Sequence, residues 1–439
     1  MRRLLFLLLF GLGLYGAYWF AAHRLFDEGS YRKQVAFGSV FVPYGWAYAL
    51  GILLGLVLLV LLYSLVYTAL LNRLQGRKRS PWPLFRQGVT HLFLWVLILL
   101  VYYPVVQVVA ASFDPTNNLF SFRRPDTGIL LLDAKVIPYV PNPSLENYAK
   151  LVEGVVLYPY QVGLLLLGGL ALLAVAFIGL LRRLSTPEDW MDLWQGRALL
   201  LLALSVFALA LTLSPKQFTG KGTEAKFLLW VRNTFLISGL TGLLAVLLTA
   251  TAGYAFARFR HLPGRYPMLL FFIFVQMFPG FLALVAIYYL LSHLDLLNTF
   301  TGLVLAYSGG IISFGTWVYK GYLESISPSL EEAAMVDGAT KWQVFTKILL
   351  PLSAPMFVFI FLLQFVGTYS EFVLANLVLT GVESWNVGVG LRSFTTGQFQ
   401  TKWGIFAAAS VLGSLPILFL FYGFQQYFVS GYTAGAVKE

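Results

Sequence analysis

Residues 90–111 read THLFLWVLILLVYYPVVQVVAA and contain no Lys, Arg, Asp or Glu. As a helix that rises 1.5 Å per residue, such a stretch crosses the roughly 30 Å hydrocarbon core of a bilayer. The whole chain has this character: of its 439 residues, 59% are hydrophobic and only 11% are charged, against about 25% charged in soluble domains. The composition excludes an ordinary soluble enzyme and predicts an all-α, polytopic membrane protein.

Hydrophobic segments of similar length recur along the chain and predict about ten transmembrane helices. The first follows Arg2 and Arg3 but has no clear small-residue cleavage site, so we expect an uncleaved anchor rather than a secretory signal. The segments are 4–22, 46–71, 90–111, 159–181, 197–213, 229–257, 266–291, 300–320, 354–378 and 403–429.

The loops that carry Lys and Arg predict the direction of the chain. Basic clusters at 77–86, 182–183, 258–265 and 341–347 fall on one side of the membrane if the spans alternate. The positive-inside rule makes that side cytoplasmic, so ten spans would leave both termini in the cytoplasm of an inner-membrane protein. The opposite side also carries basic residues, but in longer loops, where the rule is weaker. We therefore attribute the net charge of +11 to Lys and Arg residues that are retained on the cytoplasmic side, and not to nucleic-acid binding.

The sequence lacks the motifs of several catalytic and metal sites. It has no Cys, and its four His residues are not spaced as a metal-binding pair. It also has no G-x-x-x-x-G-K-[ST], H-E-x-x-H or G-x-S-x-G pattern. We predict no catalytic residue, no metal site and no directly bound cofactor, so any ATP would be bound by another subunit.

Residues 325–351, between the eighth and ninth predicted spans, read SISPSLEEAAMVDGATKWQVFTKILLP. Ser327 predicts the cap of a helix that begins at Pro328, where the missing N–H of proline is tolerated. Gly338 is suited to the left-handed position that closes such a helix. These residues predict a first short helix.

A second short helix follows. Thr340 and Gln343 form a capping-box pattern, and Pro351 is expected to end the helix. Apolar side chains recur every three or four residues and predict a face that packs on something, formed by Trp342, Phe345, Ile348 and Leu349.

Three parts of this segment, EAA at 332–334, DGA at 337–339 and ILLP at 348–351, resemble the EAA loop of binding-protein-dependent ABC transporter permeases. In that family the loop is a coupling helix seated in a cleft of the cytoplasmic ATPase. The resemblance therefore implies an ATPase-coupling role for Glu332, Ala333, Ala334, Asp337, Gly338, Ala339, Ile348, Leu350 and Pro351.

The similarity covers most of residues 90–439 and is closest to permeases of maltose and maltodextrin importers. AGYAFAR at 252–258 and FVQMFP at 274–279 also match. The resemblance implies a six-helix permease core with two additions, whose role stays open apart from peripheral packing or stabilisation. The predicted parts are 1–88 with two extra spans, 89–158 with the first core span, an inserted two-span hairpin at 159–213, and 214–439 with five core spans.

By the same resemblance, the chain would form half of a translocation pathway for an oligosaccharide such as maltose, maltodextrin or trehalose, by alternating access. Its partners would be a second, related permease, a dimer of ATPase subunits that hold ATP and Mg²⁺, and an extracytoplasmic solute-binding protein. Another sugar or a sugar phosphate is an open alternative.

Two polar residues within predicted spans are candidates for the translocation path. Glu371 lies inside its predicted span, where a carboxylate is costly unless it is paired or functional. Gln276 precedes Pro279, where a helix is expected to break. The alternatives are a packing kink at Gln276, and a Glu371 side chain that reaches the interface or bonds a neighbouring span. Gly309 and Gly310 predict close helix approach.

Residues 379–402 correspond in position to the external loop that enters the binding protein in the resembling family. The predicted contacts are Trp385, Phe394 and Phe399, and a solvated surface loop is the alternative. An ion-coupled secondary transporter would need ionisable residues deep in several spans, and Glu371 is the one candidate. A membrane enzyme is disfavoured by the missing motifs.

Overall fold

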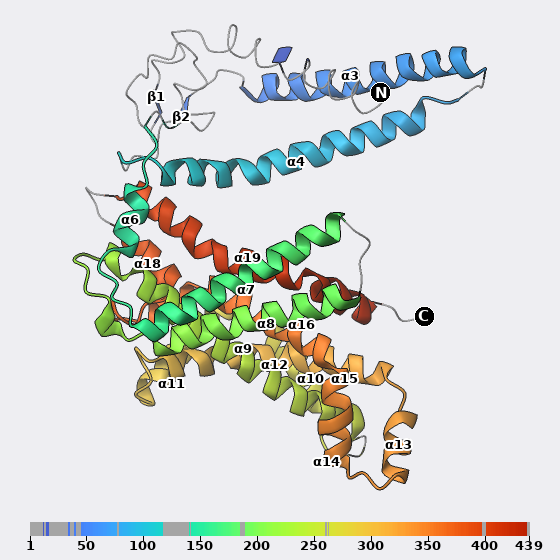
Figure 1. Cartoon of the computed structure of the whole chain (residues 1–439). Helices are drawn as coiled ribbons and strands as arrows, with labels where there is room; N and C mark the ends of the chain where they lie inside the picture. Colours follow the sequence, from blue (N-terminus) through green and yellow to red (C-terminus); the bar gives the residue numbers. More distant parts are fainter. Residues whose placement is uncertain are drawn as a thin grey trace. The chain divides into compact units, whose positions relative to one another are not determined.

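The computed structural model describes residues 12, 15–16, 34–35, 39–40, 45–76, 79–116, 140, 142–184, 189–259, 261, 263–396 and 401–436. Contacts divide the chain into two units (Figure 1): unit 1 is 1–147 with 402–408, and unit 2 is 148–401 with 409–439. The described elements are overwhelmingly helical, as the composition predicts. The predicted division into four parts remains a proposal.

Unit 1 contains two long apolar helices, α3 (Gly45–Gln75) and α4 (Trp82–Ser112), which pack on each other. A two-stranded antiparallel ribbon, β1 (Gln34–Val35) and β2 (Ser39–Val40), precedes them. The side chain of Asn147 donates to the carbonyls of Ser112 and Asp114, at 3.1 and 2.9 Å. These bonds hold the start of α6 (Glu146–Val152) at the end of α4.

Unit 2 is built around α9 (Phe227–Arg258), a helix of 32 residues that packs against α8, α12 and α16. Residues 159–213, predicted as a two-span hairpin, form α7 (Pro159–Leu184) and α8 (Asp189–Thr212), which pack on each other; that this hairpin is an insertion remains a proposal. The remaining elements are α10 (Arg265–Met277), α11 (Gly280–His293), α12 (Phe300–Ser325), α13 (Ser329–Val336), α14 (Lys341–Val344), a π-helix η5 (Phe345–Leu349), α15 (Leu350–Leu352), α16 (Ala354–Ser370), α17 (Val373–Val378), α18 (Val387–Ser393) and, from Ala409 on, α19 (Trp403–Ala436). Two 3₁₀ turns, Pro215–Gln217 and Glu224–Lys226, precede α9.

Seven of the described helices are long and apolar enough to span a bilayer. Two further pairs are sharply bent: α10 and α11 meet at 101°, and residues 341–352 meet α16 at 69°. Counting each pair as one span gives up to nine among the described residues. The first predicted segment, 4–22, lies almost wholly outside the described residues.

The break at Pro279 is confirmed. Phe278 has φ −70° and ψ 128°, an extended conformation, because a residue before proline is sterically kept out of the helical region. The predicted span 354–378, in contrast, is wrong at its end: α16 stops at Ser370, and Glu371 is extended with ψ 132°. The apolar pattern continues through this break and therefore hides it.

The close packing of α9 on α12 depends on glycines. They are not Gly309 and Gly310, the two that the sequence suggests. A Cβ at Gly253 of α9 would lie 2.6 Å from the ring of Tyr319, and one at Gly315 of α12 would lie 2.2 Å from Thr249. Gly309 and Gly310 have no neighbour within 4 Å. The prediction for these two is therefore wrong, since they face open space.

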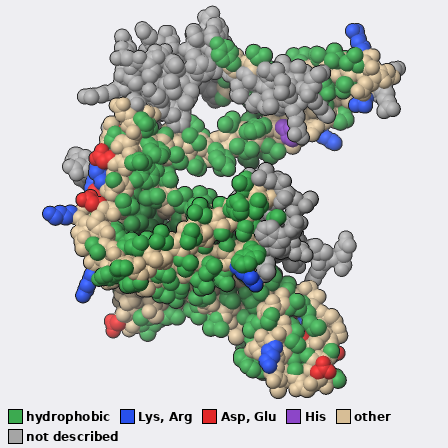
Figure 2. All heavy atoms as spheres, in the orientation of Figure 1, with side chains coloured by type: hydrophobic (Ala, Val, Ile, Leu, Met, Phe, Trp, Pro, Cys, Tyr) green, Lys and Arg blue, Asp and Glu red, His purple; other side chains and the backbone are tan. Residues whose placement is uncertain are grey.

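Hydrophobic side chains cover the lateral surface of the helices, and most charged side chains of unit 2 lie toward its two ends (Figure 2). Figure 1 places α13 and α14 at one end of unit 2 and α18 at the other. This distribution is that of a protein whose sides face lipid.

Replacement of Gly253 by Ala should destabilise unit 2, because the added methyl group meets the fully buried Tyr319. We expect a loss of roughly 1–3 kcal/mol, as for other overpacked cores, and a lower midpoint of thermal unfolding in detergent. Gly309→Ala is the matched control: with no neighbour to displace, it should keep or raise the midpoint, since alanine favours a helix by about 1 kcal/mol. Equal midpoints for both variants would contradict the proposed packing.

Candidate functional site

The EAA segment, residues 325–352, folds as two short helices joined by a tight turn. The first, α13, begins at Ser329, one residue after the predicted start, and the Ser329 N–H lies 3.4 Å from the Ser327 hydroxyl. Gly338 has φ +90°, so the left-handed closure is confirmed. The capping box is also confirmed, with Gln343 N–H on Thr340 Oγ1 at 3.2 Å and Thr340 N–H on Gln343 Oε1 at 2.8 Å.

The second helix differs from the prediction because it passes into the π-helix η5, in which an extra residue per turn shifts the buried face. Phe345 and Leu349 are buried, as predicted. Trp342 is 68% exposed instead, and Val344 takes a buried position. The residue spacing of an α-helix does not predict which side chains are buried when the helix contains a π-helical turn.

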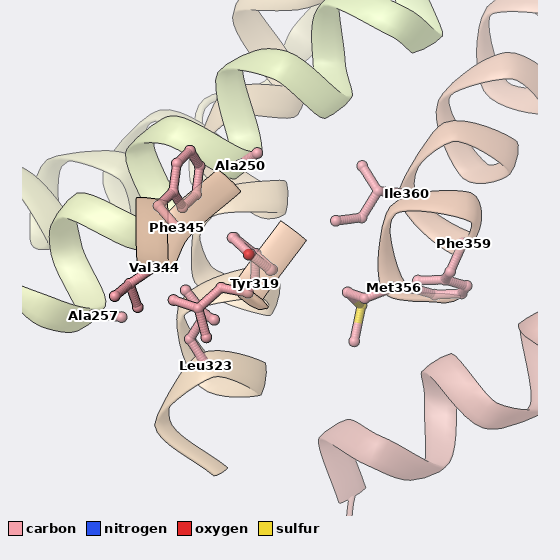
Figure 3. Packing of buried hydrophobic residues seen from close by; sticks show 10 residues of the cluster. Ala250, Ala257, Tyr319, Leu323, Val344, Phe345, Met356, Phe359 and Ile360 are labelled. Carbon is pink, nitrogen blue, oxygen red and sulfur yellow. The ribbon is translucent and has the colours of Figure 1, made fainter. Parts of the chain in front are cut away.

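The buried side chains of the EAA segment pack against residues of α9 and α12 (Figure 3). Val344, Phe345 and Leu349 join a cluster with residues of α9, α12 and α16. The ring of Phe345 stacks on Tyr254 of α9 with a centroid distance of 4.5 Å. The segment is therefore fixed to the ends of the long helices by an apolar core.

An ion pair adds a second attachment. Arg258, the last residue of α9, donates from Nε to Glu331 Oε1 of α13 at 2.5 Å, and from Nη2 to the carbonyl of Ile326 at 3.2 Å. The side chains of the pair are only 15% and 11% exposed. Sequence reasoning missed this pair, because 73 positions separate its members and no motif joins them.

The outward face of the EAA segment carries exposed apolar side chains. Val336 is 87% exposed, Trp342 68%, Leu330 44% and Met335 40%. Of the residues predicted to couple to an ATPase, Glu332, Ala333, Asp337, Gly338 and Pro351 are exposed, whereas Ala334, Ala339, Ile348 and Leu350 are partly buried. An apolar patch on a protruding segment is typical of a protein-binding surface.

At the other end of unit 2, residues 371–394 form a second ordered segment that contains α17 and α18. Glu371 starts it: its carboxylate accepts hydrogen bonds from the Tyr307 hydroxyl and from the N–H groups of Leu374 and Ala375, at 2.9 and 3.1 Å for the latter two. The alternative of a carboxylate bonded to a neighbouring span is therefore the one observed. Glu371 holds the break between α16 and α17.

The 371–394 segment is tied to its surroundings through side chains that bind its backbone. Asn298, at φ +57°, accepts from the N–H groups of Thr380 and Gly381 at 3.1 and 2.9 Å, and from the Ser384 hydroxyl. Trp230 Nε1 donates to the carbonyl of Val382 at 2.8 Å.

Two further residues of α9 complete the attachment. Asn233 Nδ2 donates to the carbonyls of Glu383 and Trp385, at 2.7 and 2.9 Å. The Val387 N–H donates to Thr234 Oγ1 at 2.8 Å. The backbone of the 371–394 segment is thus held by side chains from outside it, while the choice between a binding-protein contact and a solvated loop for residues 379–402 stays a prediction.

The three aromatic residues predicted to contact a binding protein lie in different environments. Phe394 is 2% exposed and packs on Trp230, so it belongs to the core of the segment. Trp385 is half-buried, with its ring 5.6 Å from that of Trp230. Phe399 lies outside the described residues. Gln276, proposed for the translocation path, has an exposed side chain at the α10–α11 break.

Residues 248–433 match the family of binding-protein-dependent transport system inner membrane components. The chain is also 34% identical over 362 residues to the maltose/maltodextrin transport system permease protein MalG of Vibrio vulnificus, a match that covers 81% of this chain and 96% of that protein. The chain belongs to the family of MalG-type permeases.

Other relatives agree. MalG of Salmonella typhimurium is 43% identical over 238 residues, which cover 52% of this chain and 79% of that protein, and MalG of Escherichia coli K12 is 42% identical over the same length. In fold, the chain resembles the crystal structure of a bacterial ABC transporter involved in the import of the acidic polysaccharide alginate, with a TM-score of 0.52, 15% identity, and coverage of 80% of this chain and 99% of that one. This family member is a transport subunit and not an enzyme.

The Arg258–Glu331 pair gives a test of how α13 is held. Glu331→Gln removes the charge that balances a nearly buried guanidinium, which costs about 3 kcal/mol or more in buried pairs. We expect amide exchange across 329–336 to be at least about tenfold faster, as measured by hydrogen–deuterium exchange on the purified permease. Glu332→Gln, at an exposed neighbouring position, should leave exchange unchanged; equal acceleration in both variants would show that the ion pair does not anchor α13.

Proposed function

We propose that this chain is one of two permease subunits of an ATP-driven importer for maltose and maltodextrins, or for a similar sugar such as trehalose. It would pair with a second, related permease, a dimer of cytoplasmic ATPase subunits that bind ATP and Mg²⁺, and an extracytoplasmic solute-binding protein. Membership of the MalG family supports the class of transporter, and the names of the relatives suggest the solute.

In this proposal the EAA segment is the docking site for the ATPase. The segment and both chain termini would lie on the cytoplasmic side of the membrane. The observation that carries the proposal is the construction of the segment: its inner side is fixed to α9 and α12, while apolar side chains on its outer side are exposed. A segment built in this way can receive a push from a partner and pass it to the helices as a rigid-body movement.

The 371–394 segment would lie on the external side and contact the binding protein. Among the aromatic residues first proposed, Trp385 keeps part of its ring at the surface, whereas Phe394 supports the segment from within. Glu371 would act by holding the α16–α17 break. Gln276, exposed where α10 and α11 meet at 101°, stays our candidate for the translocation path.

The docking proposal predicts the effect of a charge in the apolar patch. Val336→Asp places a carboxylate on a side chain that is 87% exposed, so the permease should fold but bury an unpaired charge in the complex, at a cost of several kcal/mol. We expect the ATPase to be lost from affinity-purified permease. Val382→Asp, the same change at a position 37% exposed at the opposite end, should retain the ATPase.

Gly338→Trp provides a second variant, since a non-glycine residue is strained at φ +90°. It should abolish either the association or the transport that depends on ATP. Retention of a coupled ATPase by both Val336→Asp and Gly338→Trp would exclude the EAA segment as the docking site.

The solute can be identified by reconstitution. The complex of both permeases and the ATPase, placed in proteoliposomes with its binding protein, should hydrolyse ATP faster and accumulate labelled sugar when maltose or maltotriose is supplied. Stimulation by a sugar phosphate instead would change the solute but keep the transporter class. Accumulation driven by an ion gradient without ATP would exclude the proposed mechanism.

A further inference from the structure

The inserted hairpin α7–α8 is attached to the core of unit 2 by specific contacts. The ring of Phe207 on α8 lies so close to α9 that a Cβ at Gly239 would be 2.9 Å from it. Near the same end of α8, the carbonyl of Ala210 accepts a hydrogen bond from Nε of Arg232, a residue of α9, at 3.1 Å. The hairpin thus contacts the helix that carries Trp230, Asn233 and Thr234.

The two ends of the hairpin are joined by buried amide side chains. Gln161 and Gln217 are 0% and 4% exposed and donate to each other at 3.2 and 2.7 Å. Gln161 also donates to the carbonyl of Thr212 at 3.0 Å, and Gln217 to that of Val156 at 2.8 Å. A polar network this well satisfied fixes the geometry of the hairpin base, since buried polar groups hold a specific arrangement of partners.

Arg232 connects the hairpin to the 371–394 segment. While Nε binds Ala210, Nη1 donates to Oδ1 of Asn233 at 3.0 Å. Asn233, which is fully buried, donates from Nδ2 to the carbonyls of Glu383 and Trp385. An unbroken line of hydrogen bonds therefore runs from α8 to the external segment.

The donors and acceptors in this series of hydrogen bonds indicate that Arg232 fixes the orientation of the Asn233 amide. An asparagine amide can turn over and exchange its oxygen and nitrogen. The guanidinium can only donate, so it holds Oδ1 of Asn233 toward itself and directs Nδ2 at the two carbonyls. In the turned-over amide, Oδ1 would face the carbonyls of Glu383 and Trp385 and both bonds would be lost.

We infer that Arg232 is a positioning residue through which the inserted hairpin holds the 371–394 segment in its binding conformation. The inference rests on the proposed function only where it assigns that conformation to contact with the binding protein. It gives the insertion a role that packing against lipid alone would not provide.

The test compares Arg232→Gln with Arg197→Gln, a substitution of an exposed arginine within the hairpin itself. In the permease–ATPase complex, we expect Arg232→Gln to raise amide exchange at 383–387 by about tenfold, as for the loss of a hydrogen bond to a charged group. Arg197→Gln should have no effect there. Arg232→Lys should resemble Arg232→Gln, because an ammonium group lacks the fork that reaches both partners.

ATP hydrolysis gives a second readout. Arg232→Gln should keep basal hydrolysis and require about tenfold more binding protein for half-maximal stimulation. If the Arg232→Gln complex does not assemble, Asn233→Ala is used in its place. This variant must show the same two effects, because it breaks the same series of hydrogen bonds. Unchanged exchange at 383–387 in the assembled variants would overturn the inference. Absence of stimulation in the unaltered complex would instead contradict the proposed function, and the exchange data would still decide the role of Arg232.

Discussion

Tyr319 of α12 places its ring against Gly253 of α9, and Thr249 of α9 lies against Gly315 of α12. Because glycine removes the side chain at each contact, the two long helices approach more closely than larger residues would permit. Close packing of this kind stabilises helices in lipid, where burial of apolar side chains away from water no longer favours association. The EAA segment and the 371–394 segment are both attached to this helix pair.

At one end of the pair, Arg258 and Tyr254 of α9 hold the EAA segment through Glu331 and Phe345. At the other end, Asn233 and neighbouring residues of the same helix hold the 371–394 segment by its main-chain groups. A single helix of 32 residues therefore joins the two surfaces. In an importer, events on opposite sides of the membrane have to be linked, and a continuous helix with fixed ends can move as one body.

The sequence predicts those parts of the fold in which the determining residues are neighbours in the chain. The Gly338 closure, the Thr340–Gln343 capping box and the Pro279 break each depend on residues within a few positions, so their patterns are readable. The Arg258–Glu331 pair and the burial of Phe394 depend on contacts between distant segments. Hydrophobicity also fails to reveal the break at Glu371, because the partners that stabilise it, the Tyr307 hydroxyl and two main-chain N–H groups, leave no apolar signature.

The base of the α7–α8 hairpin is consistent with our proposal that these two spans are an insertion into the permease fold. Val155 and Phe218 pair as an antiparallel bridge, so the chain leaves and re-enters the core at nearly the same place. The bonds between Gln161 and Gln217 close the hairpin just beyond this bridge. An insertion whose ends meet leaves the path of the surrounding chain intact, since it imposes no new separation on the elements that flank it. As two spans, the proposed insertion would also preserve the direction of every later helix. The hairpin then contributes a lateral contact to α9 at Arg232, which is the point where the core already binds the 371–394 segment.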